Sequence, residues 1–203
     1  MAAVAEMLQP AGLDAEWRRI EILAQCLLES RGEAQPSESL LQQLRDSQRQ
    51  VERWRQEPSL WQALALERLP ELALDILAAV YAPAVSPSAA LLYQDLQQSN
   101  GADPTLAFLH RLLAFNQQEY LLAQQLVAEL ANRGLLVSEG EGPLLLLQPH
   151  PTLLPVVTGL PALRLRIPGA VPIDIRADWD ELIISPAQRR MLQEYLLWIR
   201  HGE

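Results

Sequence analysis

Histidine and cysteine supply many of the nucleophiles, general bases and metal ligands in proteins. This chain has three histidines and one cysteine. His110, His150 and His201 are far apart in the sequence, and none forms a His-x-x-x-His pair or neighbours a cysteine. This spacing gives a metal site no local support. Cys26 lies among alanine and leucine with no histidine or basic cluster beside it, so we expect a small buried apolar residue.

Carboxylates gather at two places in the sequence. Asp178, Asp180 and Glu181 form one group, and Glu139 and Glu141 form another. Such pairs can serve general acid–base chemistry or bind a cation. Neither group has a nucleophilic or basic neighbour, so we expect solvated loops. We therefore predict no catalytic, cofactor-binding or metal-binding residue in this chain.

The charge of the chain excludes several further mechanisms. All 16 basic residues are arginine, and the formal net charge is −9. Without lysine there can be no P-loop lysine, no Schiff base and no Ser-Lys dyad. The sequence also lacks Gly-x-x-x-x-Gly-Lys-Ser/Thr and Gly-x-Gly-x-x-Gly. An acidic excess repels phosphate backbones. We therefore expect these 203 residues not to be an enzyme.

The elements that would position any functional side chain begin with two helices. Apolar residues recur at steps of three and four from Leu13 to Leu27, with Asp14 as a possible cap. A second amphipathic helix is predicted from about Ser39 to Glu57, and Pro58 ends it. Two such helices joined by a short connection predict a helical hairpin over residues 1–58.

Four more helices are expected between residues 59 and 134. Each predicted start carries an apolar run, a proline or a capping residue. These starts are Pro70, Ser86-Pro87, Asp103-Pro104 and Asn116, the last with Glu119 at the capping-box spacing. We expect the second of these helices to turn Leu91, Leu92 and Leu96 inward.

A short β-hairpin is predicted after these helices. Two apolar runs, Leu135 to Ser138 and Leu144 to Gln148, flank the turn Gly140-Glu141-Gly142-Pro143. Helices followed by a hairpin are the order of a winged helix, and the extra helix makes this a variant of it. We therefore predict a mainly α fold in which residues 59–160 form a winged-helix-like domain, with another short helix within residues 150–158.

A winged helix suggests DNA binding, so the charge of this segment is informative. Between residues 59 and 150 there are three arginines and nine acidic residues. A duplex binder needs several phosphate contacts from basic residues. The helix expected to enter the groove offers Arg111 alone, and the hairpin offers no basic residue. We therefore expect this domain to bind protein rather than DNA.

Residues 161–203 differ in composition from the rest. Prolines from Pro149 to Pro172 exclude long helices and indicate a semi-rigid linker, with a short strand at Leu163 to Ile167. A C-terminal helix is expected from Ser185-Pro186 to Ile199. There is no basic N-terminal region of a secretory signal and no apolar run near the ~20 residues that span a bilayer. We expect a cytoplasmic protein that is not bound to a membrane.

The order of several segments resembles the variant winged-helix domain that precedes the ATPase core of some bacterial AAA+ ATPases. Those ATPases are associated with extracellular contractile injection systems and are implicated in assembly of the particles. The segments that carry the resemblance are Glu71 to Pro83, Tyr93 to Leu96, Pro104-Thr105 with Leu112-Leu113, Arg133 to Leu136, Pro151 to Gly159, and Trp179 to Ile183.

The resemblance covers about Leu69 to the C-terminus and implies a parent protein that binds ATP and Mg²⁺ and forms a homo-hexamer. The Walker A and Walker B motifs of that family are missing here, so no residue of this sequence inherits nucleotide binding. Residues 161–203 would then be the linker and the start of the missing ATPase core.

These observations predict a non-catalytic, N-terminal protein-interaction and regulatory module. Its partner would be another protein or a neighbouring subunit. Trp54, Trp61, Tyr93 and Tyr120 are the candidate contacts, although most of them are expected in the core. Two alternatives remain open: a stand-alone winged-helix regulator that binds DNA, and an assembly adaptor without a motor.

Overall fold

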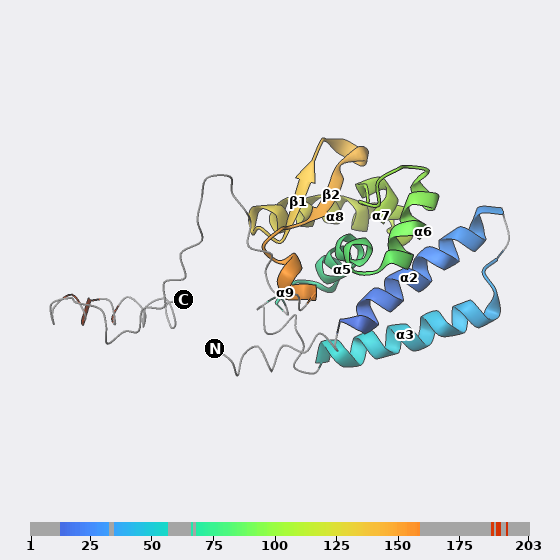
Figure 1. The fold of residues 1–203 in the computed structure, drawn as a ribbon, viewed down its shortest axis with the longest axis horizontal. Helices are drawn as coiled ribbons and strands as arrows, with labels where there is room; N and C mark the ends of the chain where they lie inside the picture. The colour runs from blue at the N-terminus through green and yellow to red at the C-terminus, as the bar shows by residue number, and fades with distance from the viewer. Residues whose placement is uncertain are drawn as a thin grey trace. The chain divides into compact units, whose positions relative to one another are not determined.

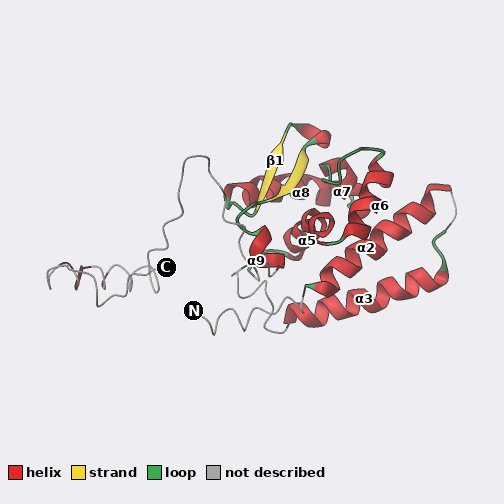
Figure 2. Cartoon of the chain, viewed as in Figure 1, coloured by secondary structure: helices red, strands yellow, loops and turns green. Residues whose placement is uncertain are grey.

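The computed structural model describes residues 13–32, 35–56, 66, 68–158, 188, 190, 191 and 194. Contacts between Cα atoms divide the chain into two units, Met1–Leu163 and Arg164–Glu203. The described part of the first unit is mainly helical with one small antiparallel sheet, as predicted (Figures 1 and 2). Its elements are α2 (Asp14–Glu29), η2 (Ser30–Gly32), α3 (Glu38–Gln56), α5 (Glu71–Val85), α6 (Pro87–Gln97), α7 (Leu106–Leu112), α8 (Gln117–Asn132), β1 (Leu136–Glu139), η3 (Gly142–Leu144), β2 (Leu146–Pro149) and α9 (Leu154–Thr158).

Helices α2 and α3 form the predicted hairpin and lie side by side (Figure 1). The bounds of α3 agree with the sequence prediction to within one residue. The predicted cap of α2 was wrong, because Asp14 is the first helical residue and the N-cap, Leu13, makes no side-chain hydrogen bond. Asp14 instead places its carboxylate in the first turn, where the helix dipole favours negative charge.

Helix α5 forms the centre of the core. Its side chains from Ile76 to Ala82 are completely buried. A helix that is apolar around its whole circumference must be covered on every side. Helices α2, α6 and α8 and strand β2 all contact it, and they share one hydrophobic core with it.

Pro83 lies inside the last turn of α5 and leaves one carbonyl without its helical partner. Proline has no N–H to donate to the oxygen of Ala79, four residues earlier. The hydroxyl of Tyr93, on α6, donates a hydrogen bond to that oxygen at 2.9 Å. Tyr93 is completely buried, and its ring also meets Phe108 edge to face at 4.6 Å between centroids. One side chain therefore satisfies the backbone of α5 and packs α6 against α7.

Ser86 caps α6 as predicted, with its hydroxyl accepting from the N–H of Ala89 at 3.3 Å and Pro87 at the first helical position. The prediction of which side of α6 faces the core was partly wrong. Leu91 is 68% exposed, whereas Ala89, Tyr93 and Leu96 are buried. The buried face is set by the angle at which α6 meets α5, 106° for this pair, and the apolar pattern alone does not define that angle.

The start of α7 also differs from the prediction. Thr105, rather than Asp103, is the N-cap, and its hydroxyl accepts from the N–H of Phe108 at 3.2 Å. Pro104 and Thr105 are extended and pair with the hairpin, since Leu147 donates to the oxygen of Pro104 and Thr105 forms a bridge with Leu146. Pro104, which was predicted to start the helix, therefore belongs to a short strand-like segment that pairs with β2.

Helix α8 and the β-hairpin follow the prediction closely. Asn116 and Glu119 form a complete capping box at the start of α8. Strands β1 and β2 pair in antiparallel register from Leu136 opposite Pro149 to Glu139 opposite Leu146. The helix expected within residues 150–158 is α9. The helix that directly precedes the hairpin is α8, so Arg111 does not belong to it but to α7.

Tyr81 of α5 forms hydrogen bonds with both ends of the hairpin. Its hydroxyl donates to the oxygen of Leu135 at 2.6 Å and accepts from the N–H of His150 at 3.0 Å. These two residues come just before β1 and just after β2. Burial raises the pKa of Tyr81 to about 12.

In the second unit the described residues Gln188, Arg190, Met191 and Glu194 are helical, within the range of the expected C-terminal helix. The strand predicted at residues 163–167 and residues 159–172 of the predicted linker lie outside the described residues, whereas at the start of that linker Pro149 ends β2 and Pro155 is part of α9.

Candidate interaction surface and buried charge cluster

Helix α8 presents an outer face on which two leucines are exposed. Its core side is formed by Ala123, Leu126, Val127 and Leu130, at the spacing of one helical stripe. Leu121 and Leu122 fall outside this stripe and are 56% and 45% exposed. We call the exposed side chains of Gln118, Leu121, Leu122, Gln125 and Ala128 the α8 face. These two adjacent leucines make the α8 face a candidate surface for contact with another molecule.

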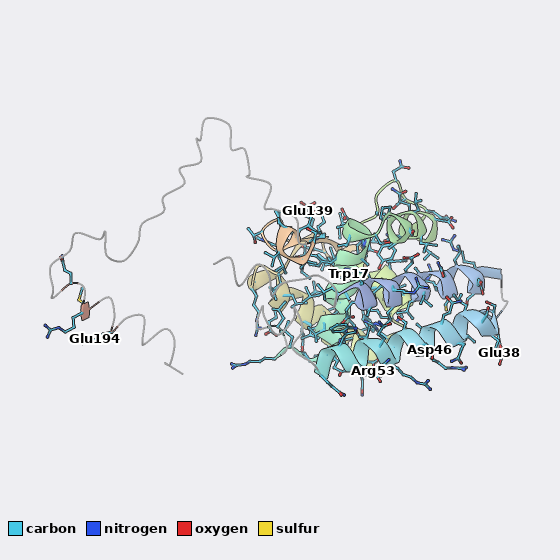
Figure 3. The ribbon with its side chains drawn as sticks, turned by 60° about the horizontal axis from the view of Figure 1, so that its bottom comes forward. Trp17, Glu38, Asp46, Arg53, Glu139 and Glu194 are labelled. Atoms are coloured by element: carbon cyan, nitrogen blue, oxygen red, sulfur yellow. The ribbon has the colours of Figure 1, made fainter. Side chains whose placement is uncertain are left out.

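The charge around the α8 face is negative. Helix α8 contains Glu119 and Glu129 and no basic residue. Arg133, directly after it, is held by Glu129 at 2.6 Å. The hairpin adds the exposed Glu139, labelled in Figure 3, and Glu141. Among the described residues of α8 and the hairpin there is no free arginine to bind a phosphate group. This surface is better suited to contact an apolar or basic protein surface.

The hairpin tip carries a further exposed leucine. Leu144 ends η3 and is 75% exposed. The tip is held by Gly140 and Gly142, which adopt φ values of +93° and +63° that other residues rarely adopt. Leu144 lines an open groove of about 830 Å³ that also includes Phe108 and Arg111 of α7 and Arg31 of η2. Arg31 is paired with Asp95 at 3.3 Å.

The structure places the four candidate contact residues differently. Tyr93 is a core residue, as described above, so its side chain is closed to a partner. Trp54 and Tyr120 are partly buried, and Tyr120 packs edge to face against His110 at 5.2 Å between ring centroids. Trp61 lies outside the described residues. Leu121 and Leu122 were not singled out, although their position off the stripe of Ala123 and Leu126 was a usable signal.

A cluster of four charged side chains joins the three helices α2, α3 and α5. Glu16 and Arg19 come from α2, Arg55 from α3 and Asp75 from α5. Arg55 bonds to Glu16 at 2.9 Å and to Asp75 at 2.7 Å, and Arg19 bonds to Asp75 at 2.6 Å and to Glu16 at 3.3 Å. Each arginine therefore contacts both carboxylates, and the four formal charges cancel. We call these residues the charge cluster.

Burial makes the charge cluster sensitive to the loss of any member. Glu16 and Arg19 are 1% and 4% exposed. Burial by itself lowers the pKa of Arg55, but the hydrogen bonds and charges of Glu16 and Asp75 outweigh it, and the pKa is raised. The Nε of Arg19 is buried and has no partner among the described residues. A buried charge that loses its counterion is costly, so the cluster fixes how α3 sits on α2 and α5.

Cys26 is buried, as expected, between α2 and α3, where Ile22 and Leu40 pack against it. Burial, with a smaller effect of Glu29, raises the pKa of its thiol and disfavours the reactive thiolate. Within the described ranges no three residues of the His, Cys, Asp and Glu types are grouped to hold a metal ion. His150 makes a short contact with the hydroxyl of Thr152 at 2.7 Å.

Comparisons of the chain with known protein families, with curated proteins and with solved structures gave no match. In the part of the chain that the structure describes, no individual helix combines the length and apolar character needed to cross a bilayer. Helices α5 and α6 meet the length and composition only when taken together; they are bent by 106° at their junction, and α5 is buried in the core.

Proposed function

We propose that this chain is a non-catalytic protein-interaction and regulatory module, and that the α8 face is the surface that contacts the partner. The observation that carries the proposal is the exposure of Leu121 and Leu122 on a capped helix whose surroundings are acidic. Apolar contacts flanked by negative charge suit a protein partner and oppose a phosphate backbone.

A winged-helix-like arrangement of residues 59–160 is part of the proposal. It is supported by the order of α7, α8, β1 and β2, and by the bridge between Thr105 and Leu146, which adds a third strand-like segment to the hairpin. In this arrangement α8 takes the position of the helix that reads DNA in winged-helix regulators. An α8 without a basic residue favours a protein ligand at that position.

The link to an AAA+ ATPase rests on the resemblance of Glu71 to Pro83 and the segments that follow it. Under this proposal ATP and Mg²⁺ bind to the motor of the parent protein, which is cytoplasmic and hexameric, and the module biases assembly or activity by binding a partner or neighbouring subunit. Such coupling requires different affinities for two states of the motor. A reading frame that continues past Glu203 into a Walker A motif would support this link, and a stop codon there would favour an adaptor without a motor.

A binding comparison tests the interaction surface. The purified chain is used to capture proteins from its native cytoplasm, alongside a Leu121→Arg/Leu122→Arg variant and a Leu91→Arg control. Leu91 is 68% exposed on α6, so the control adds charge to an exposed leucine away from the α8 face. We expect one or more proteins retained by the native chain and the control to be lost from the double variant, with unchanged circular dichroism.

A titration with a random-sequence DNA duplex at low and moderate salt completes the test. We expect no binding. Duplex binding that weakens steeply with salt, or equal retention of all proteins by the double variant, would reject the proposed surface.

A further inference from the structure

Helix α3 is attached to the rest of the molecule differently from the other long helices. Of its side chains only Leu40, Ser47 and Val51 are buried. Leu40, with Leu41 and Leu44, packs on Ile22 and Cys26 in a small cluster that is separate from the main core. Among the described residues, the main core contains no side chain of α3. Figure 3 shows other side chains of α3, Asp46 and Arg53 among them, pointing away from α2.

A groove runs along α3. It has a volume of about 560 Å³. Leu44 and Gln48 of α3 line it together with residues of three other helices, Arg19 and Leu23 of α2, Asp75 of α5 and Leu112 of α7. Within the described residues α3 packs mainly against α2. The C-terminal end of α3 is held by Arg55, through Glu16 and Asp75.

Helix α2 is held independently of α3. Trp17, Ile20 and Ala24 belong to the main core. Arg19 pairs with Asp75 of α5, and Arg31 of η2, directly after α2, pairs with Asp95 of α6. Loss of α3 would therefore leave α2 attached to the body formed by α5 to α9.

We propose that α3 is a detachable strap, which separates from α2 and loses its helical hydrogen bonds as one unit while α2 and the α5–α9 body stay folded, and that Arg55 of the charge cluster holds it in place. Local opening of a helix with few buried apolar contacts costs less free energy than global unfolding. Opening uncovers the apolar strip of Ile22 and Cys26 and leaves Glu16 and Asp75 to share Arg19. Opening of α3 thus exposes a second apolar surface, and this inference does not depend on the α8 face.

Ser47 provides a way to strengthen the strap. Its hydroxyl is buried and has no hydrogen-bond partner among the described residues. A buried hydroxyl without a partner is destabilising, and alanine is a better helix former than serine. Ser47→Ala should therefore make opening rarer, whereas Arg55→Gln should make it more frequent.

Two readouts on the full chain report opening. Cys26 is the only cysteine, so N-ethylmaleimide labelling followed by mass spectrometry measures how often α3 uncovers it. Hydrogen–deuterium exchange of residues 38–56 measures the same event on the backbone, and exchange in α5 and α8 measures global unfolding. In the native chain we expect α3 to exchange well before α5, with Cys26 labelled through the same opening.

The variants decide between local and global opening. Arg55→Gln should accelerate both Cys26 labelling and α3 exchange by about tenfold or more relative to exchange in α5. Arg53→Gln, on the same helix end but solvent-exposed, should leave both unchanged. Ser47→Ala should slow both. The proposal is overturned if α3 and α5 exchange together in the native chain, or if Ser47→Ala leaves the labelling rate unchanged. Neither of these two outcomes depends on Arg55→Gln, so the proposal can be tested even if that variant fails to fold.

Discussion

The hydroxyl of Tyr93 lies 2.9 Å from the carbonyl oxygen of Ala79, the acceptor that Pro83 leaves without a helical N–H. Both groups are in the core, where water cannot replace the missing bond. The contributions of Pro83 and Tyr93 to stability are therefore coupled, because Pro83 removes the helical donor to the carbonyl of Ala79 and Tyr93 replaces it.

This relationship predicts an interaction energy between the two positions. Tyr93→Phe should lower the free energy of unfolding by about 1 to 3 kcal/mol, because the carbonyl of Ala79 becomes unsatisfied. In a Pro83→Ala background the new N–H can bond to that carbonyl, so the same change should cost less. Urea unfolding of the four proteins measures both costs. Equal costs in the two backgrounds would show that the carbonyl of Ala79 is not the reason for the effect.

Glu16 balances two arginines in the charge cluster. Glu16→Gln leaves Arg19 and Arg55 with Asp75 as their remaining carboxylate in the cluster, and should lower the free energy of unfolding by about 3 kcal/mol. Asp14→Asn, an exposed change in the first turn of the same helix, is the control and should cost less than about 1 kcal/mol. Thermal or urea unfolding measures both. A loss of similar size in the two variants would contradict the importance of the cluster.

Tyr81 predicts a loss of stability in alkali. Its pKa is raised from 10 to about 12 in the folded chain, so the folded state favours the neutral phenol. The corresponding stability is complete below pH 10 and is lost as the pH rises towards 12, because the unfolded chain releases the proton first. The chain has no lysine to titrate in this window.

Urea midpoints at pH 9 and pH 11.5 measure this loss. Tyr81→Phe should reduce the difference between the two midpoints, and the contribution of Tyr93 should remain, since burial raises its pKa as well. The Tyr81→Phe protein should also be less stable than the native chain at pH 9, because Leu135 and His150 lose their shared partner. An unchanged pH dependence in the variant would exclude Tyr81 as its cause.

The capping box of α8 predicts a local cost. Asn116→Ala removes the acceptor for the N–H groups of Gln118 and Glu119, and should lower the free energy of unfolding by about 1 kcal/mol. Gln118→Ala, an exposed change in the first turn, should have little effect. Urea unfolding of the two variants makes the comparison. If Gln118→Ala proves as costly as Asn116→Ala, the cap is not what starts the helix.

Features set by near neighbours were predictable. Asn116 and Glu119 are three residues apart, and Ser86 caps a helix that starts at the next residue, so both signals act within one turn. The hairpin is local too, since a glycine-rich turn separates its strands. Errors arose where a distant segment competes for the same groups. The segment at Pro104 pairs with β2, and this pairing moves the cap of α7 to Thr105.

The sequence by itself determined the bounds of α3, the starts of α6 and α8, the hairpin, the acidic charge and the absence of lysine, because these depend on composition or on residues within a few positions of each other. The tertiary structure alone decided that Arg55 meets Glu16 across 39 positions, that Tyr93 is buried, and that Leu91, Leu121 and Leu122 face outward. Periodicity marks a stripe on a helix, whereas its burial depends on how the helices cross, and that angle follows from packing of the whole core.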